Sequence, residues 1–569
     1  MSINPDSTGA VDASNLLWQS NPLCVTVSPS CPSIMTDYSL AASCRPSTFS
    51  NITFFGGEVL DIQATLITNY TAYAPEALRL TAPAVTLTEA TFCNVTIAYT
   101  HPGQDDRLTV ETWLPVENPG WNGRLEAVGG GGWAAGRLAG FSYGTMTGAL
   151  ADGFATTTTD GGVSSENGFD PSSWVLNSPG NVNWLDLNNF AFVSLKEQAI
   201  IGKAVITSFY GRGPSYSYWN GCSQGGRQGL QLAQRYPDAY DGIVAGAPGL
   251  YLTRVAASLY WPQQVMNNLQ AWPYGCELDA LSAAATAACD GLDGVIDGAI
   301  SASADECLAA FDPFTVVGTP VENCRQAGNR TVEISRAAAA VVNATWHGVT
   351  TAKGKKVWHG VPPGADLSND GADGSVPGVA VTDCSSGTCV GIPQPLTPPW
   401  FNLFLAGGDP SFDLASMTHE EYDEFVHLSR HVYRSTLETD DPDLSRFRDA
   451  GGKLITWHGL WDELIPSKGT EQYYNEVAAT VSDVDGFFRH FEIPGLGHCF
   501  GRSSSNPTSL FAQLQAWVEN STAPTQSSVK LTVPDGSVHN RIICAYPKMA
   551  VLGQDGCDDP ADEGCWSCV

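Results

Sequence analysis

The stretch that decides the fold is Trp219-Asn220-Gly221-Cys222-Ser223-Gln224-Gly225-Gly226. It contains G-x-S-x-G, in which glycines two positions before and after the serine permit a sharp turn from a strand into a helix. The residues at 215–219 are short and aromatic like a buried strand, and those at 227–236 have helical spacing. The alternative is a glycine-rich turn without chemistry. Because the pattern stands between a strand and a helix, we interpret Ser223 as a nucleophile.

A serine nucleophile needs a base, and the chain reads Gly495-Leu496-Gly497-His498-Cys499. One cysteine directly precedes Ser223 and another directly follows His498. If Cys222 and Cys499 are bonded, their Cα atoms lie about 4.4 to 6.8 Å apart, which brings the two side chains within reach. Other histidines have ordinary interpretations as pocket, core or helix-surface residues: His347, His359, His458, His419, His427 and His431. We therefore predict His498 as the base.

The third member of a triad is an acid that orients the imidazole and stabilises the imidazolium. Residues 453–457 are typical of a strand, and Asp462 and Glu463 follow it in the next loop. We favour Asp462, with Glu463 as the competitor and a solvated acidic loop as the alternative without function. The order serine, acid, histidine is that of α/β-hydrolases.

A tetrahedral oxyanion needs donors placed where its charge develops. One candidate is the backbone N–H of Gln224. A second donor would come from Gly129-Gly130-Gly131-Gly132, which follows a predicted strand at 124–128, and Gly131 or Gly132 is favoured. The alternative for this run is a flexible turn.

Strand-like and helical segments alternate from about residue 91, which predicts a mostly parallel α/β sheet. Between about 250 and 440 this rhythm is replaced by alanine-rich helices and Gly/Pro/Asp-rich turns. We predict a disulfide-tied N-terminal segment at 1–90, to which we assign no secondary structure because it has no strong periodicity, an α/β-hydrolase domain whose first part is 91–249, an inserted lid domain at 250–440, and the second part of the hydrolase domain with a C-terminal disulfide segment at 441–569.

The composition favours a globular protein: 43% of the 569 residues are hydrophobic and 15% are charged. The net charge of −31 argues against binding to nucleic acid or an anionic membrane. No apolar run is long enough to span a bilayer.

Sixteen scattered cysteines indicate an oxidising compartment. Glycosylation sequons begin at Asn51, Asn69, Asn94, Asn329, Asn343 and Asn520. Together they predict a secreted glycoprotein, although residues 1–6 have no feature of a signal peptide.

The Cys-Ser and His-Cys couples around a hydrolase triad resemble the tannase and feruloyl esterase family, whose members join the two loops by this bridge. The resemblance runs from about residue 93 to 568. It implies that Cys222 and Cys499 support a Ser223, Asp462 and His498 triad. It also implies hydrolysis of galloyl, feruloyl or cinnamoyl esters, as in plant polyphenols or cell walls, through an acyl-serine intermediate.

Residues 289–299, Cys-Asp-Gly-Leu-Asp-Gly-Val-Ile-Asp-Gly-Ala, are similar to the calcium loop in that family's lid. The resemblance implies a structural Ca²⁺ whose ligands would be the carboxylates of Asp290, Asp293 and Asp297 and the carbonyls of Val295 and Ala299. Independently of the family, three nearby carboxylates offer the hard oxygen ligands that calcium prefers. The alternative is two ordinary Asp-Gly turns.

Other functions stay open at this point. The same fold could serve as a non-catalytic binding protein, as an esterase for another aromatic or alkyl ester, or as a serine peptidase. A binding protein usually lacks one triad member, whereas this chain has a candidate for each. The cysteine couples disfavour a peptidase.

Overall fold

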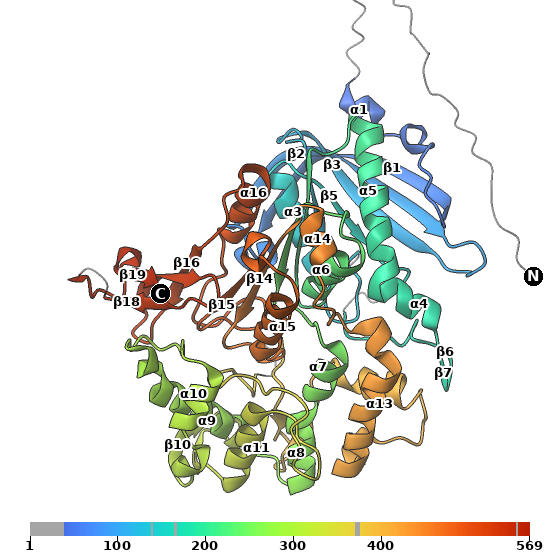
Figure 1. The fold of residues 1–569 in the computed structure, drawn as a ribbon. Coiled ribbons are helices and arrows are strands. Elements are labelled where there is room, and N and C mark those ends of the chain that lie inside the picture. The colour runs from blue at the N-terminus through green and yellow to red at the C-terminus, as the bar shows by residue number, and fades with distance from the viewer. Residues whose placement is uncertain (1–38, 138–139, 164–167, 370–375, 554–555) are drawn as a thin grey trace, which may run out of the picture. The chain divides into compact units, whose positions relative to one another are not determined.

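The computed structural model describes residues 39–137, 140–163, 168–369, 376–553 and 556–569, and a nine-stranded sheet is its central element (Figure 1). The strands in sheet order are β1 (Glu58–Ala74), β2 (Val85–Thr100), β3 (Leu108–Glu117), β5 (Ala155–Thr159), β4 (Arg124–Val128), β8 (Tyr216–Cys222), β9 (Gly242–Gly246), β14 (Lys453–Gly459) and β15 (Phe488–Ile493). The pairs from β1 to β5 are antiparallel, and those from β5 to β15 are parallel. The predicted α/β-hydrolase class is confirmed.

Helices cover both faces of this sheet because successive strand residues point to opposite sides. On β8, Trp219 joins a hydrophobic cluster with residues of α5 (Ser194–Tyr210), α6 (Gln224–Arg235) and α15 (Ser467–Thr480). Its neighbour Tyr218 joins a second cluster, with α16 (Leu510–Asn520). Helix α3 (Gly140–Ala151) contributes to a third cluster beside β2, β3 and β4. The carboxyl ends of the parallel strands are thereby held rigidly.

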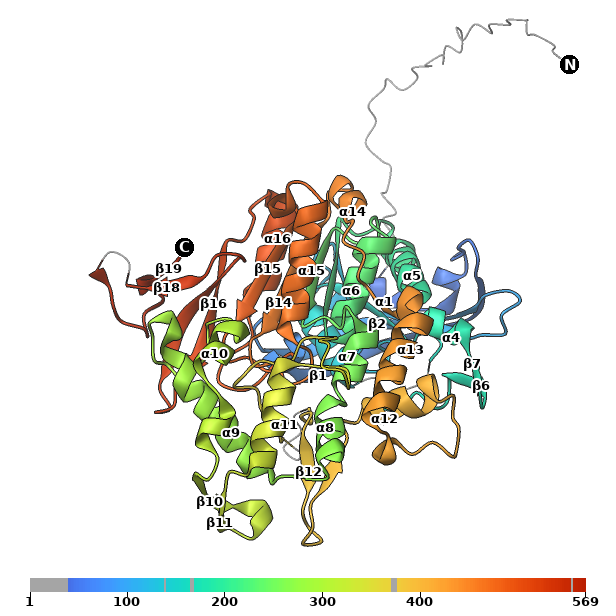
Figure 2. The ribbon, with the colours of Figure 1, turned by 60° about the horizontal axis from the view of Figure 1, so that its bottom comes forward.

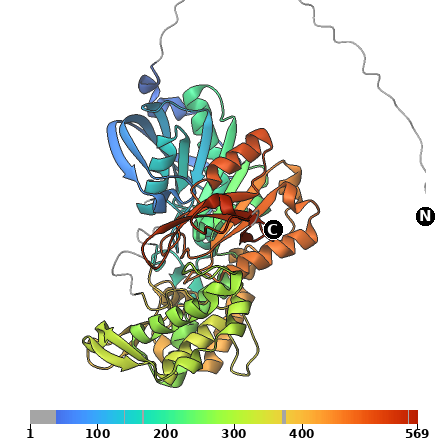
Figure 3. The same ribbon diagram turned by 90° about the vertical axis from the view of Figure 1, so that its left-hand side faces the viewer.

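A long segment leaves the sheet after β9 and returns at β14, its neighbour. Its helices are α7 (Leu252–Ser258), α8 (Trp261–Leu269), α9 (Gly275–Cys289), α10 (Ala304–Ala310), α11 (Arg336–His347), α12 (Thr397–Pro399), α13 (His419–Leu437) and α14 (Ser445–Asp449). It also holds the hairpins β10–β11 (Pro320–Cys324, Arg330–Glu333) and β12–β13 (Val381–Asp383, Val390–Ile392). Figures 2 and 3 show α8 to α11 gathered beyond one end of the sheet. This is the region where we predict the lid.

The remaining elements are short. They are the helices α1 (Leu40–Ser43), α2 (Glu76–Arg79) and α4 (Trp184–Asn188), and the hairpins β6–β7 (Leu176–Ser178, Asn181–Val182), β16–β17 (Gln526–Thr532, Val538–Cys544) and β18–β19 (Ala550–Leu552, Trp566–Cys568). All described residues except Ser39 belong to one unit, Leu40–Val569. Within the described part of the chain, no helix is long and apolar enough to cross a membrane.

The sequence pattern before residue 90 assigns no secondary structure, whereas the structure has regular elements there. Strand β1 and the start of β2 form one edge of the large sheet. Residues of β1 alternate between exposed and half-buried positions, with a buried residue only at Ala74, so this edge strand has no strong apolar pattern to detect. A disulfide does join Cys44 to Cys93, whereas Cys24 and Cys31 lie outside the described residues.

The described residues contain seven disulfides, which fit the predicted disulfide-rich class. Besides Cys44–Cys93, they are Cys222–Cys499, Cys276–Cys324, Cys289–Cys307, Cys384–Cys389, Cys544–Cys568 and Cys557–Cys565. Three of them close the insertion upon itself, and two tie the C-terminal hairpins. Only Cys222–Cys499 joins the segment before the insertion to the segment after it.

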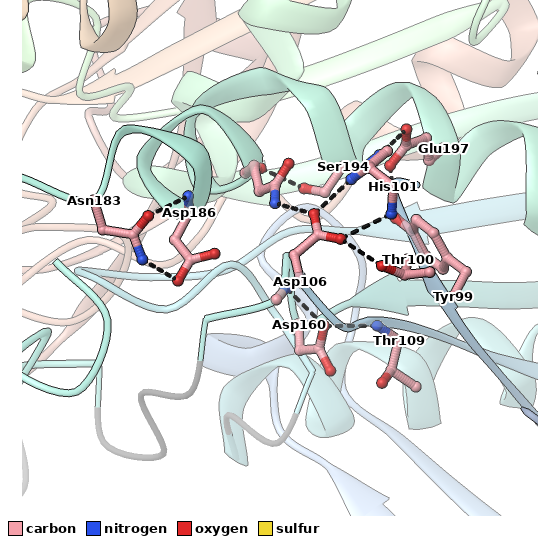
Figure 4. A network of polar contacts seen from close by, with 12 residues as sticks. Tyr99, Thr100, His101, Asp106, Thr109, Asp160, Asn183, Asp186, Ser194 and Glu197 are labelled. Carbon is pink, nitrogen blue, oxygen red and sulfur yellow. Dashed lines mark hydrogen bonds and ion pairs between the residues drawn. The ribbon is translucent and has the colours of Figure 1, made fainter. Parts of the chain in front are cut away.

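A buried polar network fastens the end of β2 to α5 (Figure 4). His101 Nδ1 lies 2.6 Å from Asp106 Oδ2, and its Nε2 lies 2.7 Å from Glu197 Oε1. Tyr99 donates a hydrogen bond to the other oxygen of Glu197, and Asn189 donates one to Asp106. One imidazole therefore bridges two carboxylates on different elements.

Candidate active site

Ser223 stands at the turn between β8 and α6, with φ 62° and ψ −120°. This left-handed conformation is rare for a residue with a side chain and marks a strained turn. A Cβ on Gly221 would lie 2.6 Å from the carbonyl carbon of Gly225, and one on Gly225 would lie 3.0 Å from Gly130 O. Both glycines of the G-x-S-x-G pattern are therefore required by close backbone contacts.

Asp462 follows β14 and is fully buried. Its Oδ1 accepts hydrogen bonds from the backbone N–H groups of Leu464 and Ile465, at 2.9 and 2.8 Å. Its Oδ2 lies 2.8 Å from His498 Nδ1. Burial alone would raise the pKa of Asp462, but the charge of His498 and hydrogen bonds from His458 and His498 lower it well below its usual range. The carboxylate is thus ionised and faces the imidazole.

Glu463, the competitor for the acid role, is also buried, but it contacts a different part of His498. Its Oε2 accepts a hydrogen bond from the backbone N–H of His498 at 3.1 Å, and its Oε1 lies 3.7 Å from Arg502 Nη2. Burial and the charge of Asp462 raise the pKa of Glu463. The geometry favours Asp462 as the partner of the His498 imidazole, whereas Glu463 binds the backbone N–H of His498.

His498 follows β15 and is 6% exposed. Burial lowers its pKa, but the charge and the hydrogen bond of Asp462 and the charge of Glu463 outweigh this, so that the net pKa is raised. The disulfide Cys222–Cys499 has an S–S distance of 2.05 Å and a Cα–Cα distance of 5.9 Å. The disulfide joins the residue before Ser223 to the residue after His498. The side chains of Ser223 and His498 line the same two cavities.

The glycine run after β4 approaches the nucleophile turn. The N–H of Gly130 already donates to Gln228 Oε1 at 2.9 Å. Gly131 borders the larger cavity beside Ser223, and Gly132, with φ +57°, borders both cavities. Gln224 borders the smaller one at the first residue of α6, where backbone N–H groups have no partner within the helix. Because the N–H of Gly130 is engaged, Gly131 or Gly132 stays the prediction for the second oxyanion donor.

The two cavities on either side of Ser223 are strongly apolar. The larger has a volume of about 260 Å³ and lies between the glycine run, α2, α3 and the Cys222–Cys499 bridge. The smaller has about 40 Å³ and lies against α7 of the insertion. The insertion contributes Leu252, Val255, Ala256, Leu259, Val376 and Leu396 to these walls. The insertion's tryptophans Trp261, Trp346, Trp358 and Trp400 are buried and line neither cavity, and Trp400 stacks on Trp133 of the hydrolase domain.

The predicted calcium loop lies far along the chain from the triad, after α9. Asp290 accepts hydrogen bonds from the N–H groups of Asp297 and Gly298, and Asp293 accepts one from Val295. The N–H of Ala299 donates to Asp297 Oδ1, at 3.3 Å.

Two carboxylates of this loop, those of Asp293 and Asp297, contact one cation, Arg541 of β17. Its guanidinium bonds Asp297 Oδ2, and its Nη2 lies 3.6 Å from Asp293 Oδ2. Among the described residues, one group of three Asp, Glu, Cys or His side chains has its ligand atoms close enough together to hold a metal ion, within 4.8 Å of one another. The group consists of Cys557, Asp562 and Cys565, and its two cysteines are bonded to each other. The three loop carboxylates are thus drawn to Arg541 and to backbone N–H groups.

One residue of the site was missed by the sequence analysis. His458, which we interpreted as a pocket or core residue, is fully buried on β14 with its Nε2 3.0 Å from Asp462 Oδ2. Its spacing of four residues from the acid was the available signal, but a strand followed by a turn gives no regular i,i+4 contact. Only the tertiary structure reveals the pairing.

Comparisons with known proteins point to one family. The family model described as "Tannase and feruloyl esterase" matches residues 93–566. A probable feruloyl esterase of Arthroderma benhamiae is 36% identical over 466 residues, covering 80% of this chain and 82% of the relative. A mono(2-hydroxyethyl) terephthalate hydrolase of Piscinibacter sakaiensis is 30% identical over 479 residues, covering 77% of each chain. The solved structure of a tannin acyl hydrolase from Aspergillus niger superposes with a TM-score of 0.78 at 27% identity and covers 94% of each chain.

Proposed function

Because the chain belongs to the tannase and feruloyl esterase family, we propose that it hydrolyses esters of aromatic acids through an acyl intermediate on Ser223. The observation that carries this proposal is the contact of 2.8 Å between Asp462 Oδ2 and His498 Nδ1, on a loop bonded through Cys499 to the residue before Ser223. The resulting order of groups is that of a serine hydrolase triad.

The reaction follows from these positions. His498 donates its Nδ1–H to Asp462, which leaves Nε2 free to take the proton of Ser223 Oγ as that oxygen attacks the ester carbonyl. Backbone N–H groups of Gln224 and of Gly131 or Gly132 stabilise the oxyanion. The proton on His498 passes to the leaving alcohol. Water then attacks the acyl-serine with His498 again as base, which releases the acid and restores Ser223.

The cavity walls favour an acyl group with few hydroxyls. The polar side chains beside the larger cavity are already engaged: Thr145 donates to Leu78 O, and Asn220 bonds Glu126 and Thr81. In the smaller cavity, Gln224 Nε2 is buried without a hydrogen-bond partner among the described residues, so it can serve one acceptor. A galloyl ring would bury three hydroxyls, and each unpaired one costs about 1–3 kcal/mol. We therefore assign the chain a cinnamoyl-type acyl preference over a galloyl one.

The test compares methyl ferulate, methyl gallate and mono(2-hydroxyethyl) terephthalate as substrates of the oxidised protein, with Ser223→Ala as control. We expect kcat/KM for the ferulate to exceed that for the gallate by at least about 10-fold, which corresponds to one unpaired hydroxyl. Turnover must disappear in Ser223→Ala. Faster gallate hydrolysis would reverse the acyl preference, and binding of these esters without turnover of any would support the non-catalytic alternative.

We propose calcium as a structural ion of the insertion, held by the carboxylates of Asp290, Asp293 and Asp297 and the carbonyls of Val295 and Ala299. Support comes from charge: three carboxylates lie in one short loop, two of them share the guanidinium of Arg541, and Asp293 Oδ2 is buried without a hydrogen-bond donor among the described residues. Burial and the charges of Asp290 and Asp293 raise the pKa of Asp297 despite Arg541. A divalent cation would remove this excess of negative charge.

We also propose that the protein works outside the cell as a glycoprotein. The seven disulfides of the described residues support an oxidising compartment. The sequon asparagines that are exposed are Asn51, Asn69, Asn329 and Asn520. Asn94 is half-buried and its amide donates to Glu111 Oε1 at 3.1 Å, so we expect it to stay unmodified.

A further inference from the structure

Two histidines share one oxygen of the acid. His498 Nδ1 lies 2.8 Å from Asp462 Oδ2, and His458 Nε2 lies 3.0 Å from the same atom. The other oxygen, Oδ1, accepts the N–H groups of Leu464 and Ile465. An ionised carboxylate has about four acceptor sites, so these four donors fill them. No proton-bearing neighbour of Asp462 is redundant in this arrangement.

The partners of His458 determine which of its nitrogens carries hydrogen. Its Nε2 faces two acceptors, Asp462 Oδ2 and the backbone carbonyl of Ile465, both at 3.0 Å. Nε2 must therefore be an N–H donor. Its Nδ1 lies 2.8 Å from Thr470 Oγ1 on α15, and that hydroxyl can donate to it. A neutral imidazole with hydrogen on Nε2 thus satisfies every contact.

We infer that His458 is a positioning residue of the esterase: its Nε2–H holds Asp462 Oδ2 in line with His498 and moderates how strongly that oxygen attracts the catalytic imidazolium. The inference rests on the proposed triad. Without His458, Oδ2 would keep His498 as its only side-chain donor, inside a site from which water is excluded. The carboxylate could then turn, and its undivided negative charge would stabilise the protonated form of His498.

Two consequences separate this role from simple core packing. A looser carboxylate misplaces the imidazole, which lowers kcat more than it raises KM, because the base acts in the transition state. A more stabilised imidazolium needs a higher pH to lose its proton, so the acid limb of the profile of kcat/KM against pH moves to higher pH. The other charged groups near His498 are Glu463 and Arg502, which the substitutions below leave in place.

The test substitutes His458 by Phe, which removes the N–H, and by Gln, whose amide nitrogen can occupy the position of Nε2. His490→Phe is the matched control: His490 is also fully buried, lies on the neighbouring strand β15 and contacts a threonine hydroxyl, Thr456 Oγ1, at 3.0 Å. Among its described contacts none reaches the triad. Activity is followed with p-nitrophenyl acetate across pH, together with thermal unfolding.

We expect His458→Phe to lose about 10- to 100-fold in kcat, with KM within about 3-fold and the acid limb moved to higher pH. His458→Gln should recover most of the rate and the wild-type limb. His490→Phe should lower Tm without moving the limb. An unmoved limb in His458→Phe, with a rate loss no larger than that of His490→Phe, would overturn the inference.

Two further measurements keep the outcome decisive. If His458→Phe does not fold, His458→Asn replaces it, because its shorter amide reaches toward Thr470 but not Asp462; equal profiles for Asn and Gln would overturn the inference. Proton NMR of the imidazole C–H groups follows the titration of His498 without any substrate. If the wild type hydrolyses no ester, the proposed function fails, whereas an upward shift of the His498 titration in His458→Phe still supports the positioning role.

Discussion

Asp462 and Glu463 are adjacent acids in one loop, and burial does not distinguish them, since they are 0% and 3% exposed. Their partners do. Asp462 meets the imidazole of His498, and Glu463 meets the backbone N–H of the same residue. Sequence reasoning could favour the first acid but could not separate the two roles, because the choice depends on a loop from a distant part of the chain. His458 was missed for another reason: a strand followed by a turn gives no regular contact between residues four positions apart.

Neutralising each acid in turn should separate these roles. Asp462→Asn removes the charge that stabilises the imidazolium and favours the wrong tautomer of the His498 imidazole. We therefore expect kcat to fall about 10³- to 10⁴-fold. Glu463→Gln keeps an oxygen that can accept the N–H of His498, so kcat should stay within about 10-fold. Steady-state kinetics with methyl ferulate measure both. A larger loss for Glu463→Gln than for Asp462→Asn would exchange the assignments.

At the scale of elements, the parts of the fold that surround the triad were predictable. The predicted elements at 124–128, 215–219, 227–236 and 453–457 correspond to β4, β8, α6 and β14. Each is buried on one or both sides, so its apolar pattern is strong. Strand β1 was missed because it lies at the sheet edge and is half exposed. The pairings of cysteines within the insertion depend on tertiary contacts and do not follow from the sequence.

The network of Figure 4 makes the attachment of β2 to α5 depend on pH. Burial lowers the pKa of His101, but the hydrogen bonds that its imidazole donates to Asp106 and Glu197 outweigh this, so that the net pKa is raised. A raised folded-state pKa stabilises the protein fully below the unfolded value and loses that effect as pH rises through the folded value. Replacing His101 by Gln should therefore cost about 1.5–3 kcal/mol at acid pH and less at alkaline pH.

Thermal unfolding of wild type and His101→Gln across pH measures this difference. The gap in Tm should narrow as pH rises past the raised pKa of His101. His490→Gln provides a buried histidine on another strand as comparison. A gap that stays constant from acid to alkaline pH would show that His101 contributes through packing rather than charge.

A bound calcium ion would stabilise the loop that follows α9. Chelation with EGTA should lower Tm, and added Ca²⁺, but not Mg²⁺, should restore it, since the loop offers many flexible oxygen ligands. Asp293→Asn should start at the lower Tm and respond to neither treatment. Identical unfolding of wild type with EGTA and with Ca²⁺ would leave Arg541 as the partner of these carboxylates and reject the ion.

For the whole molecule, the Cys222–Cys499 bridge connects halves of the sheet that the insertion separates in sequence. Replacing both cysteines by alanine should cost about 2–5 kcal/mol of stability and lower kcat by at least about 10-fold, because Ser223 and His498 are no longer tied. The control replaces Cys384 and Cys389, which close a hairpin of the insertion and should leave kcat unchanged. Denaturant unfolding and initial rates are the measurements. An unaltered kcat without the catalytic bridge would assign it to stability alone.

The chain leaves the sheet after β9 and returns at the adjacent strand β14, so the two ends of the insertion lie side by side. The triad and the glycine run are encoded outside this segment, while α7 and Leu396 within it form walls of the cavities. In genetic terms, the catalytic residues and one part of the substrate-contacting wall occupy separate stretches of one reading frame. A gene can therefore diversify its ester preference by replacing or lengthening a single internal block, and inherit an intact catalytic apparatus each time.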